Sequence, residues 1–484
     1  MSADAHTGYG GRGSPAGRPA EGNDNKVMPG ADMPLNTFQQ FMRQWTRLGP
    51  YTAGQAMCVR GRPDAEKMRL AALRLLAEIG LGIPEFGDHA VRFTPVDVLE
   101  VQVSDQNIEQ IAALQMNRPF TPSDIPLRFF LINTPESSAD PTGPRHWVLV
   151  MYDHWLADSG GMRMFMQSLA AYYLDCPSLA GASAGSPPRL PGQNIVWPPA
   201  GRSPLFGRCR TIAGGLKFYI RHRRAWRVNL ADPLDFSVGL KLQSLPDGLI
   251  NRLQTAARRH RGSVNDLFLA AIARAMGPLM QAGGTDFRGG LLGRRDRLSL
   301  GTIVDMRHLA GPQLADVFGL YLGFSTTQVN LADIRQTTAL IQSITRQTRR
   351  YKSRSEAGLA LRTLDVARFF WRMYDQPRHQ ALFFQKNTPV AAGVSNVNLT
   401  AQWMCPAQRP ADFPILDYIR ISPTGPLLPL VLTLTTVGPL PSTNSDISDS
   451  RLNLSFTWRK TAMNEPAAEN LCRDFVRGLE DMAS

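Results

Sequence analysis

One histidine and one aspartate, four positions apart, offer acid–base chemistry in this chain. His154 and Asp158 lie in the segment HWLADSGG. Histidine is the side chain that accepts and returns a proton near neutral pH. Gly160 and Gly161 follow, and glycines let a backbone and a substrate approach each other closely. The same pattern is also typical of a histidine that only caps the end of a strand. The secondary structure around the motif is therefore needed to decide whether His154 is a base or a structural residue.

A buried strand is expected directly before the motif and a helix directly after it. Residues 147–152 read WVLVMY, an apolar run typical of a buried strand, and residues 127–132 form a second such run. From residue 162 to 174 apolar residues recur at helical spacing. The polar residues of the motif therefore follow the end of a buried strand, where they could face a cleft.

The motif resembles the HxxxD signature of the chloramphenicol acetyltransferase superfamily. This superfamily includes nonribosomal peptide condensation domains, plant-type acyltransferases and bacterial wax ester synthase/diacylglycerol acyltransferases. Weaker markers occur in the family's order over residues 34–484: NRPF at 117–120, PLR at 126–128, GSVNDL at 262–267, VDMR at 304–307 and VSNV at 394–397. The ordered set, more than any single marker, carries the resemblance.

Two positions depart from the family pattern. Asp153 stands where the doubled form of the motif has its first histidine, and Ser159 stands where the family has glycine. The chain also lacks a DFGWG segment, which disfavours the plant-type branch. Ser159 therefore places a side chain at a position where the family has none.

The resemblance implies an α/β fold, an α+β sandwich, in which two chloramphenicol acetyltransferase-like halves form a pseudo-dimer with a central cleft. We expect residues 1–33 to be a disordered tail and residues 34–180 to form the half that carries HxxxD. Residues 181–204, rich in Pro, Gly and Ser, read as a linker, and residues 205–484 form the other half.

The resemblance also assigns roles to the motif residues. His154 would act as general base on a hydroxyl or amine of a small-molecule acceptor that attacks a thioester. The donor would be acyl-coenzyme A or an acyl-phosphopantetheine on an acyl or peptidyl carrier protein, with no tightly bound cofactor and no metal. Asp158 would be structural and paired with Arg307, and Gly160 and Gly161 would support the loop.

Several further residues are candidates for contacts to the oxyanion or the substrate. The oxyanion donors would be backbone N–H groups near Ser159 and Gly160, or the hydroxyl of Ser395. Asn396, Asn265 and Asp266 are candidate substrate contacts. For the last two, a helix cap and a first helical turn explain the residue types equally well.

The composition limits the classes of protein. With 484 residues, 43% hydrophobic and 19% charged, the chain reads as globular and not as a disordered or coiled-coil protein. Its net charge of +13 favours phosphates, acidic proteins such as a carrier protein, or the surface of an anionic membrane. No helix-turn-helix or zinc-finger pattern accompanies the charge, so no specific nucleic acid partner is expected. The basic residues between 202 and 227 indicate either a solvated face or a docking surface.

Cysteine usage and hydropathy favour a cytoplasmic protein. Five scattered cysteines without a C-x-x-C pair argue against a disulfide framework and against structural zinc. No apolar run reaches 18 residues, so no membrane span is expected. One alternative function stays open, a non-catalytic relative that binds a carrier protein or an assembly partner, because Ser159 and the single histidine weaken the catalytic pattern.

Overall fold

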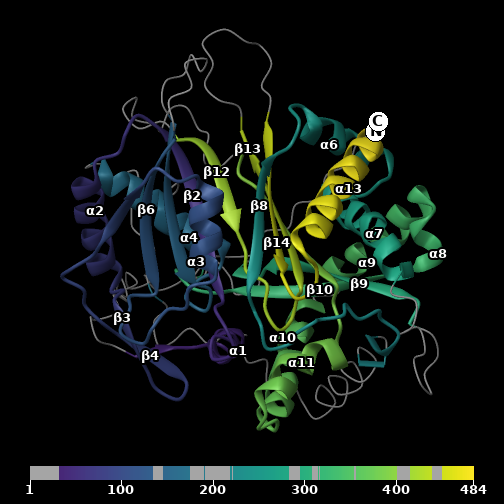
Figure 1. The fold of residues 1–484 in the computed structure, drawn as a ribbon, viewed down its shortest axis with the longest axis horizontal. Coiled ribbons are helices and arrows are strands. Elements are labelled where there is room, and N and C mark those ends of the chain that lie inside the picture. Colours follow the sequence, from purple (N-terminus) through teal and green to yellow (C-terminus); the bar gives the residue numbers. More distant parts are fainter. Residues whose placement is uncertain are drawn as a thin grey trace, which may run out of the picture.

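Two lobes, each built on one β-sheet, make up the part of the chain that the structure describes (Figure 1). The computed structural model describes residues 32–134, 145–174, 222–282, 295–307, 317–353, 356–400, 415–438 and 450–484, and residues 190, 219, 220 and 314. The predicted α/β fold with two halves is confirmed.

The first lobe contains a five-stranded sheet with the order β12-β2-β7-β6-β5. Its strands are β2 (Thr52–Arg60), β5 (Val101–Ser104), β6 (Leu127–Asn133), β7 (Arg145–Asp153) and β12 (Ile415–Ile421). The strands predicted at 127–132 and 147–152 are the central parts of β6 and β7. Strand β7 pairs antiparallel with both β2 and β6, and its apolar run is buried because it lies in the middle of the sheet.

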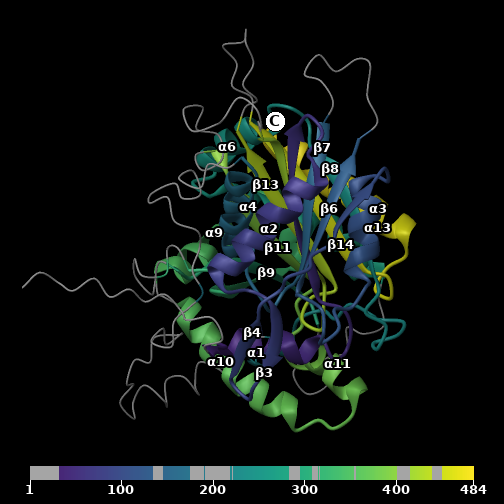
Figure 2. The same cartoon turned by 90° about the vertical axis from the view of Figure 1, so that its left-hand side faces the viewer.

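Helices pack on both faces of this sheet. Helices α2 (Ala65–Ile79) and α4 (Ser159–Tyr173) pack against each other, with α4 against β2, and α3 (Ile108–Met116) packs against β2 and β7. Helix α2 begins after Asp64, whose side chain accepts from the Lys67 amide, and ends at Gly80 in the left-handed conformation (φ +75°). Helix α1 (Thr37–Trp45) and a small sheet of β1 (Met33–Pro34), β4 (Ala90–Thr94) and β3 (Ile83–Phe86) lie at one end (Figure 2).

The second lobe contains a six-stranded sheet with the order β10-β9-β11-β13-β14-β8. Its strands are β8 (Val238–Ser244), β9 (Arg297–Asp305), β10 (Leu322–Asn330), β11 (Ala392–Asn398), β13 (Leu430–Val437) and β14 (Arg451–Arg459). Strands β13 and β14 run antiparallel to each other, whereas β11 runs parallel to β13.

Helices of the second lobe form one large apolar core with the six-stranded sheet. They are α6 (Leu249–Arg259), α7 (Val264–Ala282), α9 (Thr337–Ser353) and α13 (Glu465–Ala483). The short helix α8 (Leu331–Ile334) ends before α9 begins. Helices α10 (Glu356–Arg372) and α11 (Pro377–Asn387) extend toward the end of the molecule that holds α1 (Figures 1 and 2).

Strand β12 crosses from the second half of the chain into the first sheet. It pairs antiparallel with β2, whose edge would otherwise be open. Side chains of β14 also bond to it: Ser455 Oγ donates to the Arg420 carbonyl at 2.6 Å, and Asn453 Nδ2 donates to the Tyr418 carbonyl at 3.1 Å. The expected division into 34–180 and 205–484 is therefore not followed by the sheets, since β12 is shared between the lobes.

Several expectations fall wholly or partly outside the described residues. Residues 1–31 of the predicted tail are not described. Met33, the last residue of the predicted tail, pairs with Val91 in β1, so the tail was predicted to extend too far along the chain. Of the predicted linker, only Leu190 is described. Cys58 and Cys472 are buried and do not form a disulfide with each other, and the other three cysteines are not described. Among the described residues, no helix is both long enough and apolar enough to cross a membrane.

Candidate active site

The HxxxD loop connects β7 to α4 and is fixed by backbone hydrogen bonds. The His154 amide donates to the Tyr51 carbonyl at 3.0 Å, and Asp158 N–H donates to the Gly319 carbonyl at 3.1 Å. Asp158 is the N-cap of α4, and its carboxylate accepts from the Gly161 amide at 2.8 Å. The loop is therefore held from both lobes.

Hydrogen bonding defines which nitrogen of His154 can act as a base. Nδ1 lies 3.1 Å from the Ala157 carbonyl, which can only accept, so Nδ1 carries the proton and Nε2 presents a lone pair. The ring stacks on Tyr51 with 5.6 Å between centroids. Burial lowers the pKa of His154 below its usual value, although the Ala157 carbonyl and Asp158 oppose this shift. The imidazole is thus neutral at pH 7, as a general base must be.

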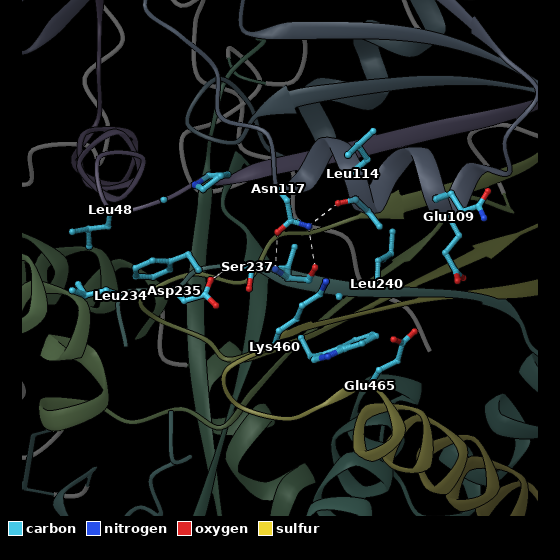
Figure 3. Close-up of a pocket in the computed structure, with 18 residues that line it drawn as sticks. Leu48, Glu109, Leu114, Asn117, Leu234, Asp235, Ser237, Leu240, Lys460 and Glu465 are labelled. Carbon is cyan, nitrogen blue, oxygen red and sulfur yellow. Dashed lines mark hydrogen bonds between the residues drawn. The ribbon is translucent and has the colours of Figure 1, made fainter. Parts of the chain in front are cut away.

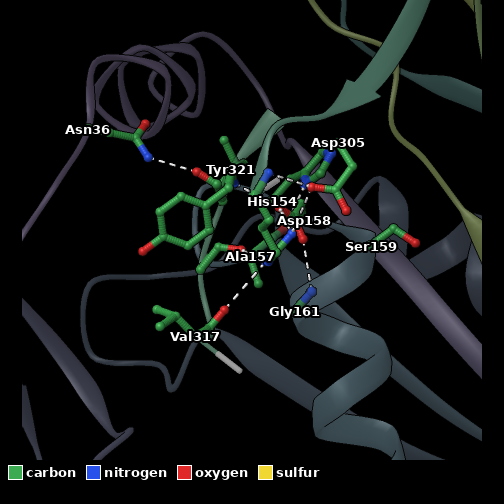
Figure 4. A network of polar contacts seen from close by, with 12 residues as sticks. Asn36, His154, Ala157, Asp158, Ser159, Gly161, Asp305, Val317 and Tyr321 are labelled. Carbon is green, nitrogen blue, oxygen red and sulfur yellow. Dashed lines mark hydrogen bonds and ion pairs between the residues drawn. The ribbon is translucent and has the colours of Figure 1, made fainter. Parts of the chain in front are cut away.

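Asp158, which is labelled in Figure 4, forms a buried ion pair with Arg307. Arg307 Nη1 lies 2.7 Å from Asp158 Oδ2, which also accepts from the Tyr321 amide at 2.7 Å. Burial acts to raise the pKa of Asp158, but the charge and hydrogen bonds of Arg307 outweigh it and keep the pKa below the ordinary value. Asp158 therefore stays ionised. Its carboxylate supports the loop and makes no hydrogen bond with the ring nitrogens of His154.

The two glycines of the motif leave space for this ion pair. A Cβ atom on Gly160 would lie 2.9 Å from Arg307 Nη1, and one on Gly161 would lie 3.0 Å from the Gly319 carbonyl oxygen. Neither position requires a left-handed backbone. The glycines are needed here because Arg307 and the segment around Gly319 approach the loop closely.

A cavity of about 280 Å³ lies between the lobes and includes His154 in its wall. Its lining comes from both sheets and from the start of α4, and it includes Gln55, Ser159, Gly160, Arg307, Ser395 and Asn396. The structure thus brings most of the predicted site residues to one cavity. Asp158 and Gly161 lie behind this surface, where they hold the loop.

Arg420 is a site residue that the sequence reasoning missed. It lies in β12, its side chain is 2% exposed, and its Nη1 donates to both Ser159 Oγ and Ser395 Oγ at 3.2 Å. Its other donors bond to Thr435 Oγ1 at 3.1 Å and to the carbonyls of Ser395 at 3.2 Å and Leu434 at 2.6 Å. Burial lowers the pKa of Arg420 to about 9, which still leaves it charged at pH 7. A charged residue inside the apolar segment ILDYIRI was the signal that could have identified it.

Ser159 and Ser395 are paired through this arginine. Because each hydroxyl oxygen accepts from Arg420, the hydroxyl proton of each is available to another acceptor. Both residues line the cavity. Ser159, which replaces the glycine of the family pattern, is therefore part of a hydrogen-bonded group with Arg420 and Ser395.

Asn265 and Asp266 are not brought to this cavity. Asp266 is 2% exposed in the first turn of α7, and it accepts from the Ser263 amide at 2.8 Å and from Thr348 Oγ1 at 2.8 Å. It thereby ties α7 to α9, in agreement with the structural alternative. Neither residue lines the cavity, because the start of α7 faces α9.

Asp153, in the position of the missing first histidine, is buried beside the loop. Burial raises its pKa to about 7, although the Trp155 hydrogen bonds and the Arg128 charge act in the opposite direction. Its Oδ1 has no hydrogen-bond partner in the described structure. Asp153 does not line the His154 cavity. The presence of aspartate in place of the first histidine of the doubled motif therefore does not alter the wall of the cavity.

A larger hollow of about 820 Å³ lies elsewhere between the lobes (Figure 3). It shares no lining residue with the His154 cavity. Asn117, from the NRPF segment, donates from Nδ2 to the Val238 carbonyl at 3.0 Å and accepts from the Val238 amide at 2.8 Å. Asn117 thus joins α3 of the first lobe to β8 of the second. We interpret this hollow as part of the interface between the lobes and not as a binding site.

The basic residues between 202 and 227 are described only in part. Arg224 pairs with Asp296 at 2.9 Å, and Arg227 donates to the carbonyls of Gln385 and Lys386 at 2.9 and 2.8 Å. Arg202, Arg208, Arg210, Lys217 and Arg221 lie outside the described residues. Arg224 and Arg227 make contacts within the protein. The prediction of a basic docking surface therefore depends on the basic residues that are not described.

Comparisons with known proteins show the fold. No protein-family model and no curated protein matches the chain in sequence. Among solved structures, the trichothecene 15-O-acetyltransferase of Fusarium sporotrichioides is similar, with a TM-score of 0.60 and 13% identity over 93% of this chain and 94% of that chain.

Two condensation domains are similar to the same extent. The condensation domain of the monacolin K polyketide synthase has a TM-score of 0.59 and 11% identity, covering 94% of this chain and 97% of that one. The first condensation domain of the CDA synthetase has a TM-score of 0.57 and 15% identity, with coverage of 94% and 97%. The chain therefore has the two-lobed fold of these acetyltransferase and condensation-domain structures.

Proposed function

We propose that the protein is an acyltransferase that moves an acyl group from a pantetheine thioester to a hydroxyl or amine of a small molecule. The observation that carries this proposal is the state of His154: its Nδ1 donates to the Ala157 carbonyl, and the ring lines a cavity between the lobes. The similarity to an acetyltransferase and to condensation domains supports the same class of reaction.

The reaction needs one base and no covalent enzyme intermediate. Nε2 of His154 would remove the proton from the acceptor O–H or N–H while the acceptor atom forms a bond to the thioester carbonyl carbon. The tetrahedral intermediate would then collapse, the C–S bond would break, and the imidazolium would return the proton to the departing thiolate. Acyl-coenzyme A or an acyl-phosphopantetheine is the donor substrate in this scheme.

Ser159 and Ser395 are suited to stabilise the oxyanion of the intermediate. Both hydroxyls accept from Arg420 Nη1, which orients their protons away from the arginine and polarises them. Two such donors, with a buried positive charge behind them, favour negative charge that develops in the cavity. Arg420 acts through the two serines in this proposal and is a positioning residue.

A thiol-release assay tests the proposal. The full-length protein would be incubated with acyl-coenzyme A and acyl-carrier donors of several chain lengths and with a panel of alcohol and amine acceptors. We expect thiol release that depends on an acceptor and that falls at least about 10²-fold in His154→Ala. His89→Ala is the matched control, because His89 is exposed and outside the cavity.

The same assay separates the alternative function. If neither the wild type nor His154→Ala consumes any thioester while both remain folded, the chain is a non-catalytic relative. An acidic carrier protein could still bind to a protein with a net charge of +13 in that case. A comparison of coenzyme A donors with carrier-protein donors shows which source of pantetheine is used.

A further inference from the structure

We propose that the cavity binds a small organic acid, whose carboxylate meets Arg163 and whose hydroxyl or amine lies at Asn396. This inference rests on the proposed function only for the statement that the acid is the acyl acceptor. The unpaired groups and the charges of the cavity wall define the site itself.

Arg163 is a cation without a partner among the residues that the structure describes. It lies on α4 one turn after Ser159, so the two side chains share a face of the helix, and both line the cavity. Arg163 is half-buried and makes no hydrogen bond or ion pair with any described residue. Burial lowers the pKa of its guanidinium, yet an arginine remains charged at neutral pH. A desolvated charge of this kind is stabilised by an anion that enters the cavity.

The carboxylates near the cavity are already engaged by another arginine. Arg307 contacts Asp158 at 2.7 Å and Asp305 at 3.6 Å. Arg420 bonds only to hydroxyl and carbonyl oxygens in the described structure, so its charge is not compensated by a carboxylate in contact with it. The wall, which also includes Asp305, therefore carries two positive charges, those of Arg163 and Arg420, and neither is in contact with a carboxylate of a described residue.

Asn396 supplies a second unpaired group of the opposite kind. Its side-chain oxygen is buried, has no hydrogen-bond partner in the described structure, and belongs to a residue that lines the cavity. A buried acceptor without a donor is costly unless a ligand satisfies it. A hydroxyl or ammonium group of the ligand would do so.

The remaining wall and the size of the cavity define the body of the ligand. Apolar side chains, among them Phe38, Met42, Leu322 and Val431, make up much of the rest of the wall. The volume of about 280 Å³ is at the lower end of ligand pockets in proteins. A hydroxy acid or amino acid with a compact apolar body fits this combination of groups.

Binding to the full-length protein tests the site independently of catalysis. Isothermal titration would compare mandelate, 3-phenyllactate and phenylalanine with their amides, mandelamide, 3-phenyllactamide and phenylalaninamide, which lack the carboxylate. Phenylacetate, which keeps the carboxylate and lacks the hydroxyl, completes the panel. We expect at least one acid to bind about tenfold or more tightly than its amide, and Arg163→Gln to remove this preference. Arg163→Lys should restore part of it, and Arg473→Gln, on the exposed face of α13, should leave it unchanged.

Asn396 is tested with the pair that differs only in the hydroxyl group. Mandelate should bind more tightly than phenylacetate to the wild type, and Asn396→Leu should abolish the difference while the preference for acid over amide persists. Circular dichroism melting of each variant verifies that it is folded.

Several outcomes would overturn the inference. They are equal binding of acids and amides, an acid preference that survives in Arg163→Gln, or no binding by any acid of the panel. Inorganic phosphate is included as a probe, and binding of phosphate without carboxylates would assign Arg163 to a donor phosphate instead. Acid binding without thiol release would contradict the proposed function alone, whereas thiol release with neutral acceptors and no acid binding would contradict the anion site alone.

Discussion

The Asp158 carboxylate and the Arg307 guanidinium, 149 positions apart in the chain, meet at 2.7 Å and join the HxxxD loop to the second lobe. Asp158 is fully buried, and Arg307 is nearly so. The pair places the start of α4, and with it Ser159, against the strands of the other sheet. The position of His154 at a cavity between lobes depends on this contact.

Removal of Arg307 should destabilise the protein strongly. We expect Arg307→Ala to lower the free energy of unfolding by about 3–5 kcal/mol, because a buried carboxylate loses its counter-charge. Urea denaturation would measure the loss, and Asp158→Asn combined with Arg307→Met should cost less than the sum of the single changes. Arg69→Ala, which breaks the exposed pair with Glu66, is the control and should leave the unfolding curve unchanged. A loss for Arg307→Ala no larger than that of the control would contradict the expectation.

The pH dependence of turnover should report the lowered pKa of His154. The base works as the neutral imidazole, so kcat/KM should be constant between pH 7 and 8 and fall only as the pH drops through a value below 6.5. Initial rates of thiol release between pH 5 and 8.5 measure this profile. A loss of rate that already begins between pH 8 and 7 would rule out a histidine with a lowered pKa as the base.

The two serine hydroxyls should contribute to turnover more than to binding. We expect Ser395→Ala and Ser159→Ala each to lower kcat by about 10²-fold with little change in KM, since an oxyanion donor acts in the transition state. Arg420→Gln should lower kcat as well, because the hydroxyls lose their orientation. Ser123→Ala, at an exposed position, is the control. An unchanged kcat in the Ser159→Ala, Ser395→Ala double variant would refute the assignment.

Asp153 should make stability depend on pH. Its pKa is about 7 in the folded protein and near 3.9 in an unfolded chain, so the folded state holds the proton more tightly. The contribution of Asp153 to stability is therefore complete below about pH 4 and is lost as the pH rises toward 7.

Replacement by asparagine should remove this dependence. Relative to the wild type, Asp153→Asn should gain about 3 kcal/mol in the free energy of unfolding when the pH is raised from 4.5 to 7.5. Urea denaturation at the two pH values measures the change, with the exposed Asp97→Asn as control. An identical pH dependence in wild type and variant would show that Asp153 does not hold a proton in the folded state.

Local sequence patterns were sufficient for the elements around the motif. The apolar run at 147–152 and the helical spacing after residue 162 gave β7 and α4, because burial and periodicity are properties of adjacent residues. The resemblance added the pairing of Asp158 with Arg307, which spacing alone could not supply. The boundaries were less accurate: β12, from the half expected at 205–484, lies in the sheet of the other half.

The sequence by itself indicated which residue could carry acid–base chemistry, one histidine at the end of an apolar strand, and its resemblance to a known superfamily predicted the two-lobed class of fold. Only the tertiary structure decided that Arg420 holds Ser159 and Ser395. It also decided that Arg163 and Asn396 line the same cavity, where the Arg163 guanidinium and the Asn396 side-chain oxygen have no hydrogen-bond partner among the described residues. These residues come from segments up to 261 positions apart. The physical reason is that hydrogen bonds and charge compensation depend on distance in space, which is set when the lobes pack together and is not encoded in the spacing along the chain.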